Sequence, residues 1–223
     1  MAAAFCFDVE GTLVDSVRLQ LACWREVLMA AGCDVQIGTL QEYSGMDGNA
    51  MLAAIVPKID KMARRKLLDR QSAVFETRYL SQVQPFDDVR RAIQRLKEAG
   101  HEVALATDCK GASLEHYRAI LGIDDLLDAI ACGEDVDEGK PNPKLLKCAI
   151  ERLHALHRTC VMVGDSPYDA QAAMACGVSS VGIMTGGFGR TTLQNAGCSE
   201  VLDTVSALPD WQSECASRSL LHG

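Results

Sequence analysis

The sequence predicts an α/β fold in which helices cover both faces of a parallel sheet, with an all-helical domain inserted after the first strand. Short apolar runs alternate with amphipathic stretches of helical period, and this alternation is typical of parallel sheets. The alternation stops from residue 16 to residue 83, where helical patterns follow one another without a strand. A chain of 223 residues is long enough for one such core with an insertion.

Apolar runs of five or six residues predict the strands of a Rossmann-like sheet. They cover residues 3–7, 102–106, 127–131, 159–163 and 179–184. Between the later runs, apolar residues recur at helical spacing and predict the helices that cover the sheet. Val89, Ile93 and Leu96 form one such pattern, with Gly100 after it as the expected end of the helix.

The inserted segment contains three helical patterns. They cover residues 17–31, 49–56 and 59–83, with Pro57 after the second and Pro85 after the third. We therefore expect two domains. Residues 1–15 and 84–223 would form the α/β core, and residues 16–83 would form a helical domain over one edge of it.

The charge balance and the composition exclude several classes of protein. With 22 basic and 30 acidic residues the net charge is −8 and no basic cluster is present, so we expect no nucleic-acid partner. No apolar stretch reaches the ~18 residues of a membrane-spanning helix. The 48% of hydrophobic and 23% of charged residues are typical of a globular protein, either a monomer or a homodimer.

The ten cysteines are spread along the chain without a CxxC pair, so neither a zinc site nor a disulfide framework is predicted. The first residues lack the basic start of a signal peptide and reach Asp8 early. We therefore expect a reduced, soluble, cytoplasmic protein in which most cysteines are small core residues.

Acidic and hydroxyl side chains follow three of the predicted strands at the point where each strand ends. These residues are Asp8, Glu10, Thr107, Asp108, Asp165 and Asp169. The carboxyl ends of parallel strands meet at one edge of the sheet, where ligands bind in open α/β folds. We therefore expect these side chains to lie around one crevice.

Such a cluster of carboxylates needs positive charge. Two unit charges ~4 Å apart repel by about 1 kcal/mol in water and by about 4 kcal/mol at an effective dielectric constant near 20. A hard cation with oxygen ligands, above all Mg²⁺, would hold the carboxylates together. Lys140, which lies in a loop fixed by Pro141 and Pro143, is the candidate for a second positive charge.

Each of these residues also has an ordinary structural interpretation. A single Asp between a strand and a helix is often a helix N-cap, and Asp15 and Ser16 are expected to cap the first inserted helix. Lys140 by itself would be a solvated loop lysine. The joint pattern, in which four loops carry suitable chemistry in a consistent order, favours a functional site.

Taken together, these segments resemble the four motifs of the haloacid dehalogenase superfamily of phosphatases and related hydrolases. The motifs are Asp8-Val-Glu-Gly-Thr-Leu-Val-Asp-Ser16, Thr107 at a strand end, Gly139-Lys-Pro-Asn-Pro143 and Gly164-Asp-Ser-Pro-Tyr-Asp169. The helical insertion resembles the small cap domain of that superfamily. The arrangement is most similar to the branch that contains phosphoglycolate phosphatase and β-phosphoglucomutase.

The resemblance implies a role for each motif residue. Asp8 would be the nucleophile that forms an aspartyl-phosphate, and Glu10 would be the general acid and base. Mg²⁺ would be held by Asp8, the backbone carbonyl of Glu10 and Asp165, with Asp169 in support. Binding of the phosphoryl group would involve a further set of residues, namely Thr107, Lys140, Gly11 and Asp108.

Two features bear on the substrate. In capped relatives a cap loop selects the substrate, and here residues 43–49, with Gly45, Met46 and Asp47, either form that loop or a plain turn between helices. The superfamily usually has Asp where this chain has Glu10, which is longer by one methylene. We expect a Mg²⁺-dependent phosphatase of a small phosphorylated metabolite. The alternatives are a phosphosugar mutase, a phosphonate hydrolase, or a weakly active binding or regulatory protein.

Overall fold

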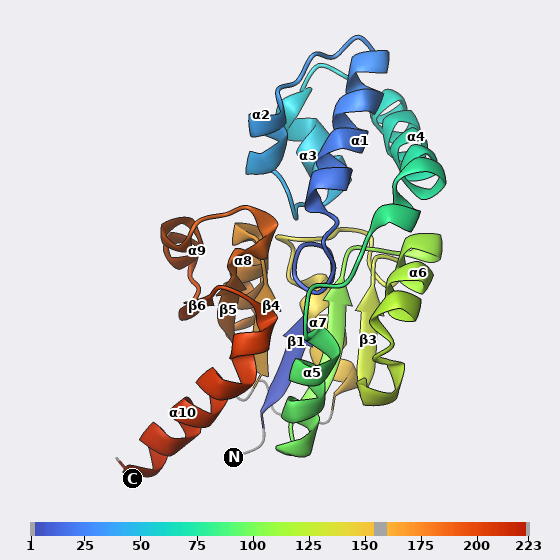
Figure 1. Cartoon of the computed structure of the whole chain (residues 1–223). Helices are drawn as coiled ribbons and strands as arrows, with labels where there is room; N and C mark the ends of the chain where they lie inside the picture. The colour runs from blue at the N-terminus through green and yellow to red at the C-terminus, as the bar shows by residue number, and fades with distance from the viewer. Residues whose placement is uncertain (1–2, 154–159, 222–223) are drawn as a thin grey trace.

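The computed structural model describes residues 3–153 and 160–221, and within them a six-stranded parallel sheet forms the centre of the molecule (Figure 1). The strand order is β3-β2-β1-β4-β5-β6. The strands are β1 (Ala4–Phe7), β2 (Glu102–Thr107), β3 (Ala129–Cys132), β4 (Cys160–Gly164), β5 (Ser179–Ile183) and β6 (Glu200–Leu202). The predicted α/β fold class is confirmed.

Two strands differ from the sequence prediction by more than one residue at either end. β3 begins at Ala129 rather than at residue 127, because a 3-10 turn (Asp124–Leu126) precedes it and the Asp128 carboxylate accepts a hydrogen bond from the Val103 backbone nitrogen. β6 was not predicted, since it has three residues and only Val201 among them is buried. The predicted strand start at Thr159 lies outside the described residues.

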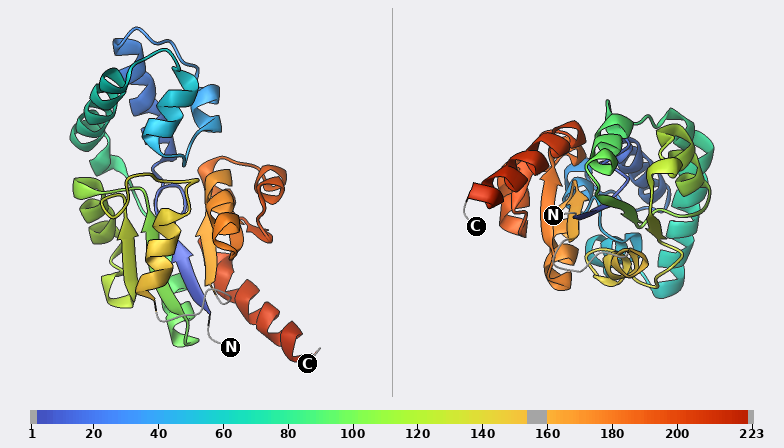
Figure 2. Two further views of the ribbon diagram at one scale, coloured as in Figure 1. Left: turned by 180° about the vertical axis from the view of Figure 1, so that it is seen from behind. Right: turned by 90° about the horizontal axis from the view of Figure 1, so that it is seen from below.

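Helices cover both faces of the sheet, as predicted (Figure 2). Along β1 the side chains alternate, so that Ala4 and Cys6 pack in one buried cluster and Phe5 and Phe7 in another. The first face is covered by α7 (Lys144–Arg152) and α8 (Pro167–Cys176). The opposite face is covered by α5 (Val89–Glu98), α6 (Gly111–Leu121) and α10 (Leu208–Leu221), while α9 (Arg190–Ala196) packs beside α8.

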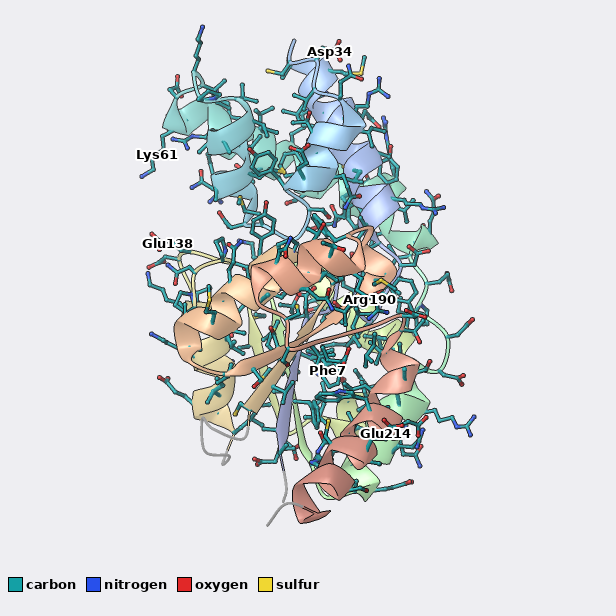
Figure 3. The ribbon with its side chains drawn as sticks, turned by 90° about the vertical axis from the view of Figure 1, so that its left-hand side faces the viewer. Phe7, Asp34, Lys61, Glu138, Arg190 and Glu214 are labelled. Carbon is teal, nitrogen blue, oxygen red and sulfur yellow. The ribbon has the colours of Figure 1, made fainter. Side chains whose placement is uncertain are left out.

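The insertion between β1 and β2 contains α1 (Val17–Ala30), α2 (Ile37–Glu42), α3 (Gly48–Ile55) and α4 (Lys61–Arg78). These helices lie over the carboxyl ends of the strands. Figure 3 shows Asp34, in the loop between α1 and α2, and Lys61, at the start of α4, at one end of the molecule, with Phe7 inside the sheet. The helix α2 was not predicted, because its six residues bury only Leu40 and give no periodic pattern.

The helix boundaries of the insertion correct two expectations. The pattern over residues 59–83 is one helix, α4, followed by a 3-10 turn (Leu80–Gln82), and Asp60 caps α4 through the Ala63 backbone nitrogen. Ser16 occupies the N-cap position of α1, but its side chain makes no capping hydrogen bond, and Asp15 lies before that position with an exposed side chain. The expected capping by these two side chains was therefore wrong.

The chain passes between core and insertion at two places that lie side by side. The Asp15 backbone nitrogen donates to the Gln84 carbonyl at 2.8 Å, and the Phe86 nitrogen donates to the Leu13 carbonyl at 3.0 Å. A β-bridge joins Val14 to Pro85 between them. The insertion is therefore attached to the core through one pair of adjacent segments.

Candidate active site

Three acidic side chains meet at the carboxyl edge of the sheet. β1 and β4 are neighbours, so Asp8 and Asp165, which follow them, are brought together, and Asp169 lies one turn into α8. One carboxylate oxygen from each of Asp8, Asp165 and Asp169 lies within 4.8 Å of the other two. The three residues are 4%, 1% and 2% exposed, so solvent does little to screen their mutual repulsion.

The side chain of Lys140 supplies the positive charge at this cluster. Its ammonium group pairs with Asp8 and donates to Asp169 Oδ1 at 2.9 Å, and the residue is 3% exposed. Burial alone would lower the pKa of Lys140, but the carboxylates of Asp169, Asp8 and Asp108 raise it well above its usual value. Lys140 is therefore a protonated partner of the acidic residues and not a solvated loop lysine.

The carboxylates are hard to ionise in spite of this partner. Burial raises the pKa of Asp8 to about 7, although Lys140 acts in the opposite direction. Burial and the neighbouring Asp8 and Asp169 also raise the pKa of Asp165 well above its usual value. One ammonium group thus compensates the acidic cluster only in part, which favours the binding of a further cation.

The structure contains one feature that fits a metal ion. Asp165 Oδ1 accepts the Thr12 hydroxyl at 3.0 Å, whereas the buried Oδ2 has no hydrogen-bond partner among the described residues. Gly186 makes room for this atom, since a Cβ there would lie 1.7 Å from Oδ2. A buried, unpartnered carboxylate oxygen beside further carboxylates suits a hard divalent cation.

Asp169 is both a helix-capping residue and a member of the acidic site, the two interpretations that its position in the sequence allowed. Its Oδ2 accepts from the Ser166 hydroxyl at 2.6 Å and from the Ser166 backbone nitrogen at 3.1 Å, in a capping box at the start of α8. Its Oδ1 binds Lys140. The helix cap therefore fixes the carboxylate that orients the lysine.

Thr107 and Asp108 lie at the end of β2, beside the lysine loop. The buried Thr107 hydroxyl oxygen accepts from the Cys109 backbone nitrogen at 3.2 Å, which leaves its proton available to a ligand. The Asp108 carboxylate accepts from the Lys140 backbone nitrogen at 3.2 Å, and a Cβ at Gly139 would lie 1.8 Å from Asp108 Oδ1. The Asp108 side chain thus holds the lysine loop in place.

Glu10 lies at the boundary between the core and the insertion. Its Oε1 accepts hydrogen bonds from Gln20 Nε2 at 2.7 Å and from the Tyr117 hydroxyl at 2.8 Å. The sequence reasoning missed both donors. Gln20 is a polar residue of the first inserted helix, whereas Tyr117 belongs to the apolar stripe of α6. Neither pattern indicates that the side chain faces Glu10.

The loop at residues 43–47 connects α2 to α3 and also contacts the core. The Asp47 backbone nitrogen donates to the Lys140 carbonyl at 2.9 Å, while its carboxylate caps α3 through the Ala50 nitrogen. Gly45 packs on Ser166, where a Cβ would lie 2.6 Å from two of its atoms, and Met46 is half-buried. The loop is therefore a turn between helices that also reaches the lysine and Asp165 loops.

Two more hydrogen bonds fix the insertion over the strand ends. Gln41 Nε2 donates to the Gly186 carbonyl at 2.9 Å, and the Tyr168 hydroxyl donates to the Glu42 carbonyl at 2.7 Å. The acidic cluster is consequently covered by the insertion.

Comparison with known proteins identifies the family. Residues 5–183 match the model of the haloacid dehalogenase-like hydrolases. The chain belongs to this family. A phosphoglycolate phosphatase from Colwellia psychrerythraea is 29% identical to this hydrolase over 188 residues, which are 81% of this chain and 83% of that protein.

Solved structures of the family are similar to this hydrolase over nearly the whole chain. A hydrolase from Pseudomonas syringae has a TM-score of 0.89 at 26% identity and covers 95% of this chain and 98% of its own. A β-phosphoglucomutase from Clostridium difficile has a TM-score of 0.84 at 17% identity, with coverage of 99% and 100%, and shares the fold. Because the model of the hydrolase family matches residues 5–183, the chain is an enzyme of the hydrolase class, as predicted.

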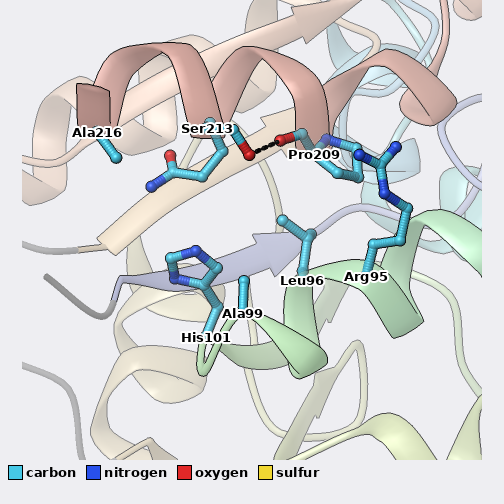
Figure 4. Close-up of a pocket in the computed structure, with 8 residues that line it drawn as sticks. Arg95, Leu96, Ala99, His101, Pro209, Ser213 and Ala216 are labelled. Atoms are coloured by element: carbon cyan, nitrogen blue, oxygen red, sulfur yellow. Dashed lines mark hydrogen bonds between the residues drawn. The ribbon is translucent and has the colours of Figure 1, made fainter. Parts of the chain in front are cut away.

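A separate pocket of this hydrolase lies at the opposite edge of the sheet, between α5 and α10 (Figure 4). Its buried His101 accepts a hydrogen bond at Nδ1 from the Ala3 backbone nitrogen at 3.0 Å and meets Phe5 edge-on. This imidazole fixes the start of β1, far along the sheet from the acidic cluster. Within the described residues, no helix combines the length and apolar character needed to cross a bilayer.

Proposed function

We propose that this hydrolase is a Mg²⁺-dependent phosphatase that cleaves a small phosphorylated metabolite through an aspartyl-phosphate on Asp8. The observation that carries the proposal is the buried contact of Asp8 with Lys140, beside an Asp165 oxygen that has no partner among the described residues. In this proposal residues 1–15 and 84–223 form the catalytic core, and residues 16–83 form the cap.

In the first step an Asp8 oxygen attacks phosphorus, the bond from phosphorus to the ester oxygen breaks, and Glu10 donates a proton to the leaving alcohol. In the second step Glu10 takes a proton from water as the water oxygen attacks the same phosphorus, which releases phosphate and restores Asp8. Neither step changes an oxidation state, so the reaction needs no redox partner.

The other residues act on charge and orientation. Lys140 balances charge on Asp8 and the phosphoryl group, while the Thr107 hydroxyl and the Asp108 backbone N–H bind phosphoryl oxygens. The Gly11 N–H, expected from the sequence to do the same, instead donates to the Val14 carbonyl at 2.9 Å. The residues that would hold Mg²⁺ are Asp8, Asp165 and the Glu10 carbonyl, with Asp169 in support. When bound, Mg²⁺ supplies positive charge between the anionic nucleophile and the anionic phosphoryl group.

A closed cap favours a small substrate. Asp47 contacts the lysine loop and Gly45 packs on Ser166, so Gly45, Met46 and Asp47 would contact the part of the substrate beyond the phosphate. Because relatives from Colwellia psychrerythraea and Xanthomonas campestris are named phosphoglycolate phosphatases, phosphoglycolate is the first substrate to test. A phosphosugar mutase or a phosphonate hydrolase is the alternative. The loop offers Asp47 and neither lysine nor arginine, which weakens the case for any doubly anionic substrate, phosphoglycolate included.

Metal dependence tests the proposal. With Mg²⁺ we expect release of inorganic phosphate from phosphoglycolate or another member of a panel of small phosphomonoesters. Removal of the metal by EDTA should lower the rate by ~100-fold or more, and added Mg²⁺ should restore it. Phosphate release that is unaffected by EDTA, or transfer between two sugar positions without release, would contradict the proposal.

The alternative of a weakly active protein rests on the extra methylene of Glu10. The Glu10→Asp variant discriminates between this alternative and an active phosphatase. Because Glu10 is fixed by Gln20 and Tyr117, we expect the shorter Asp to lose these partners and to lower kcat by ~10- to 100-fold. Glu10→Gln should lower it by ~100-fold or more. A rate that rises in Glu10→Asp would instead support a misplaced acid and a binding or regulatory role.

A further inference from the structure

A chain of hydrogen bonds runs from the inserted helix α4 to Glu10. Gln71 Nε2 on α4 donates to Gln20 Oε1 on α1 at 2.7 Å, and Gln20 Nε2 donates to Glu10 Oε1 at 2.7 Å. From the core side, the Tyr117 hydroxyl on α6 donates to the same Glu10 oxygen at 2.8 Å. Three helices thus contribute to the surroundings of one carboxylate oxygen.

The direction of each hydrogen bond is determined by chemistry. The Gln20 amide has one acceptor end and one donor end, so accepting from Gln71 turns its NH₂ group toward Glu10. Gln71 is itself buried at 9% exposure, and the Cys23 thiol donates to its backbone carbonyl at 3.5 Å. The donor that Gln20 presents to Glu10 is therefore fixed by a second, buried amide.

The two oxygens of Glu10 are consequently unequal. Oε1 receives two donors, whereas Oε2 receives no hydrogen bond from any residue that the structure describes. Glu has one more rotatable bond than Asp, and holding Oε1 from two sides removes this freedom. An oxygen held by two donors is a poor site for a transferred proton, and the other oxygen is left for that role.

On the basis of the proposed phosphatase reaction, we propose that Gln20, Gln71 and Tyr117 are positioning residues that anchor Glu10 through Oε1 and leave Oε2 to transfer the proton. None of the three touches the phosphoryl group in this arrangement. They act through Glu10, because they hold its side chain in one conformation. An Asp at this position has one rotatable bond fewer and would need less support.

Leaving-group dependence tests this proposal in Tyr117→Phe, Gln20→Met and Gln71→Met. An alkyl phosphate needs a proton on its leaving oxygen, whereas p-nitrophenyl phosphate leaves readily without one. We expect kcat/KM for the alkyl ester to fall by ~10- to 100-fold and kcat/KM for the aryl ester to fall by less than ~3-fold. The phosphorylated enzyme should also accumulate with the aryl ester, because the second step still needs Glu10, and kcat and KM should then fall together.

Two matched variants serve as controls. Tyr79→Phe removes a hydroxyl that donates to Glu26 within the insertion, and both substrates should keep their rates. Gln41→Met removes a hydrogen bond between insertion and core that does not involve Glu10, so any loss should be equal for the two substrates. Thermal melting of every variant tests whether the fold is retained.

Equal losses on both substrates in Tyr117→Phe and Gln20→Met would overturn the positioning role and leave a structural one. The proposed function fails in a different way: the wild-type enzyme would then release no phosphate from either ester, or Glu10→Gln would leave the alkyl ester rate unchanged. The two failures are therefore distinguishable with the same set of variants.

Discussion

Asp8→Asn is expected to abolish turnover, with a loss on the order of 10⁴-fold or more, because an amide cannot form the phosphorylated intermediate. The variant should remain folded. Burial raises the pKa of Asp8 to about 7, which means that the ionised carboxylate is costly to bury, and the neutral amide has nearly the same shape. Lys140 keeps its pairing with Asp169 in the variant.

Rapid-quench intact mass measurement gives the direct readout. The wild-type enzyme mixed with substrate should gain the mass of one phosphoryl group, and Asp8→Asn should not. Asp15→Asn is the matched control, because Asp15 lies in the same motif with an exposed side chain, and it should keep its rate. A phosphorylated Asp8→Asn enzyme would refute the assignment of the nucleophile.

Lys140→Met is expected to lower kcat by ~100- to 1000-fold and also to destabilise the fold. The side chain keeps a similar length but leaves Asp8 and Asp169 without their ammonium partner. Breaking a buried pair in this way costs about 3–5 kcal/mol when the remaining charges stay ionised. Added Mg²⁺ should recover part of this stability, because it binds the folded state.

The loss of stability in Lys140→Met should depend on pH. The pKa of Asp8 and of Asp165 is raised in the folded enzyme, and removal of the ammonium group raises it further. The folded state then binds more protons than the unfolded state above about pH 4, so stability decreases as pH rises through the folded pKa. Metal-free urea unfolding should therefore show a larger loss at pH 8 than at pH 5.

The matched control is Lys144→Met, which removes an exposed lysine at the start of α7 that pairs with Glu138 of the lysine loop at 3.5 Å. It should change neither turnover nor the pH dependence of unfolding. If Lys140→Met unfolds at the same urea concentration as the wild type at pH 8, the buried pair contributes no stability and the electrostatic argument is wrong.

The sequence was informative wherever one local pattern determines the structure. Strands of four to six residues gave continuous apolar runs, and the polar residues after β1, β2 and β4 meet because parallel strands share one carboxyl edge. The three-residue β6 and the six-residue α2 are too short to show a period. Such elements are formed by packing against neighbours that are distant in the sequence.

The surroundings of Glu10 could not be predicted for a related reason. Gln20 is a polar position of α1 and Tyr117 a buried position in the apolar stripe of α6. The two helices are separated in the sequence by most of the insertion and by β2, and the approach of these side chains depends on how the helices are rotated in the fold. The capping role assigned to Ser16 was wrong because its neighbours in space, and not its residue type, decide its hydrogen bonds.

The paired crossings at Asp15–Gln84 and Leu13–Phe86 have a consequence for substrate exchange. Two adjacent backbone segments form a single hinge, about which the four inserted helices can tilt as a rigid body. Three hydrogen bonds that hold the insertion over the core, those of Gln41, Tyr168 and Asp47, are neutral, and each contributes about 0.5–1.5 kcal/mol net. A fourth, from Gln20 to Glu10, has a carboxylate acceptor and contributes about 1.5–3 kcal/mol. We therefore expect the insertion to open by thermal motion once these hydrogen bonds break, which would let a substrate exchange without an external energy source.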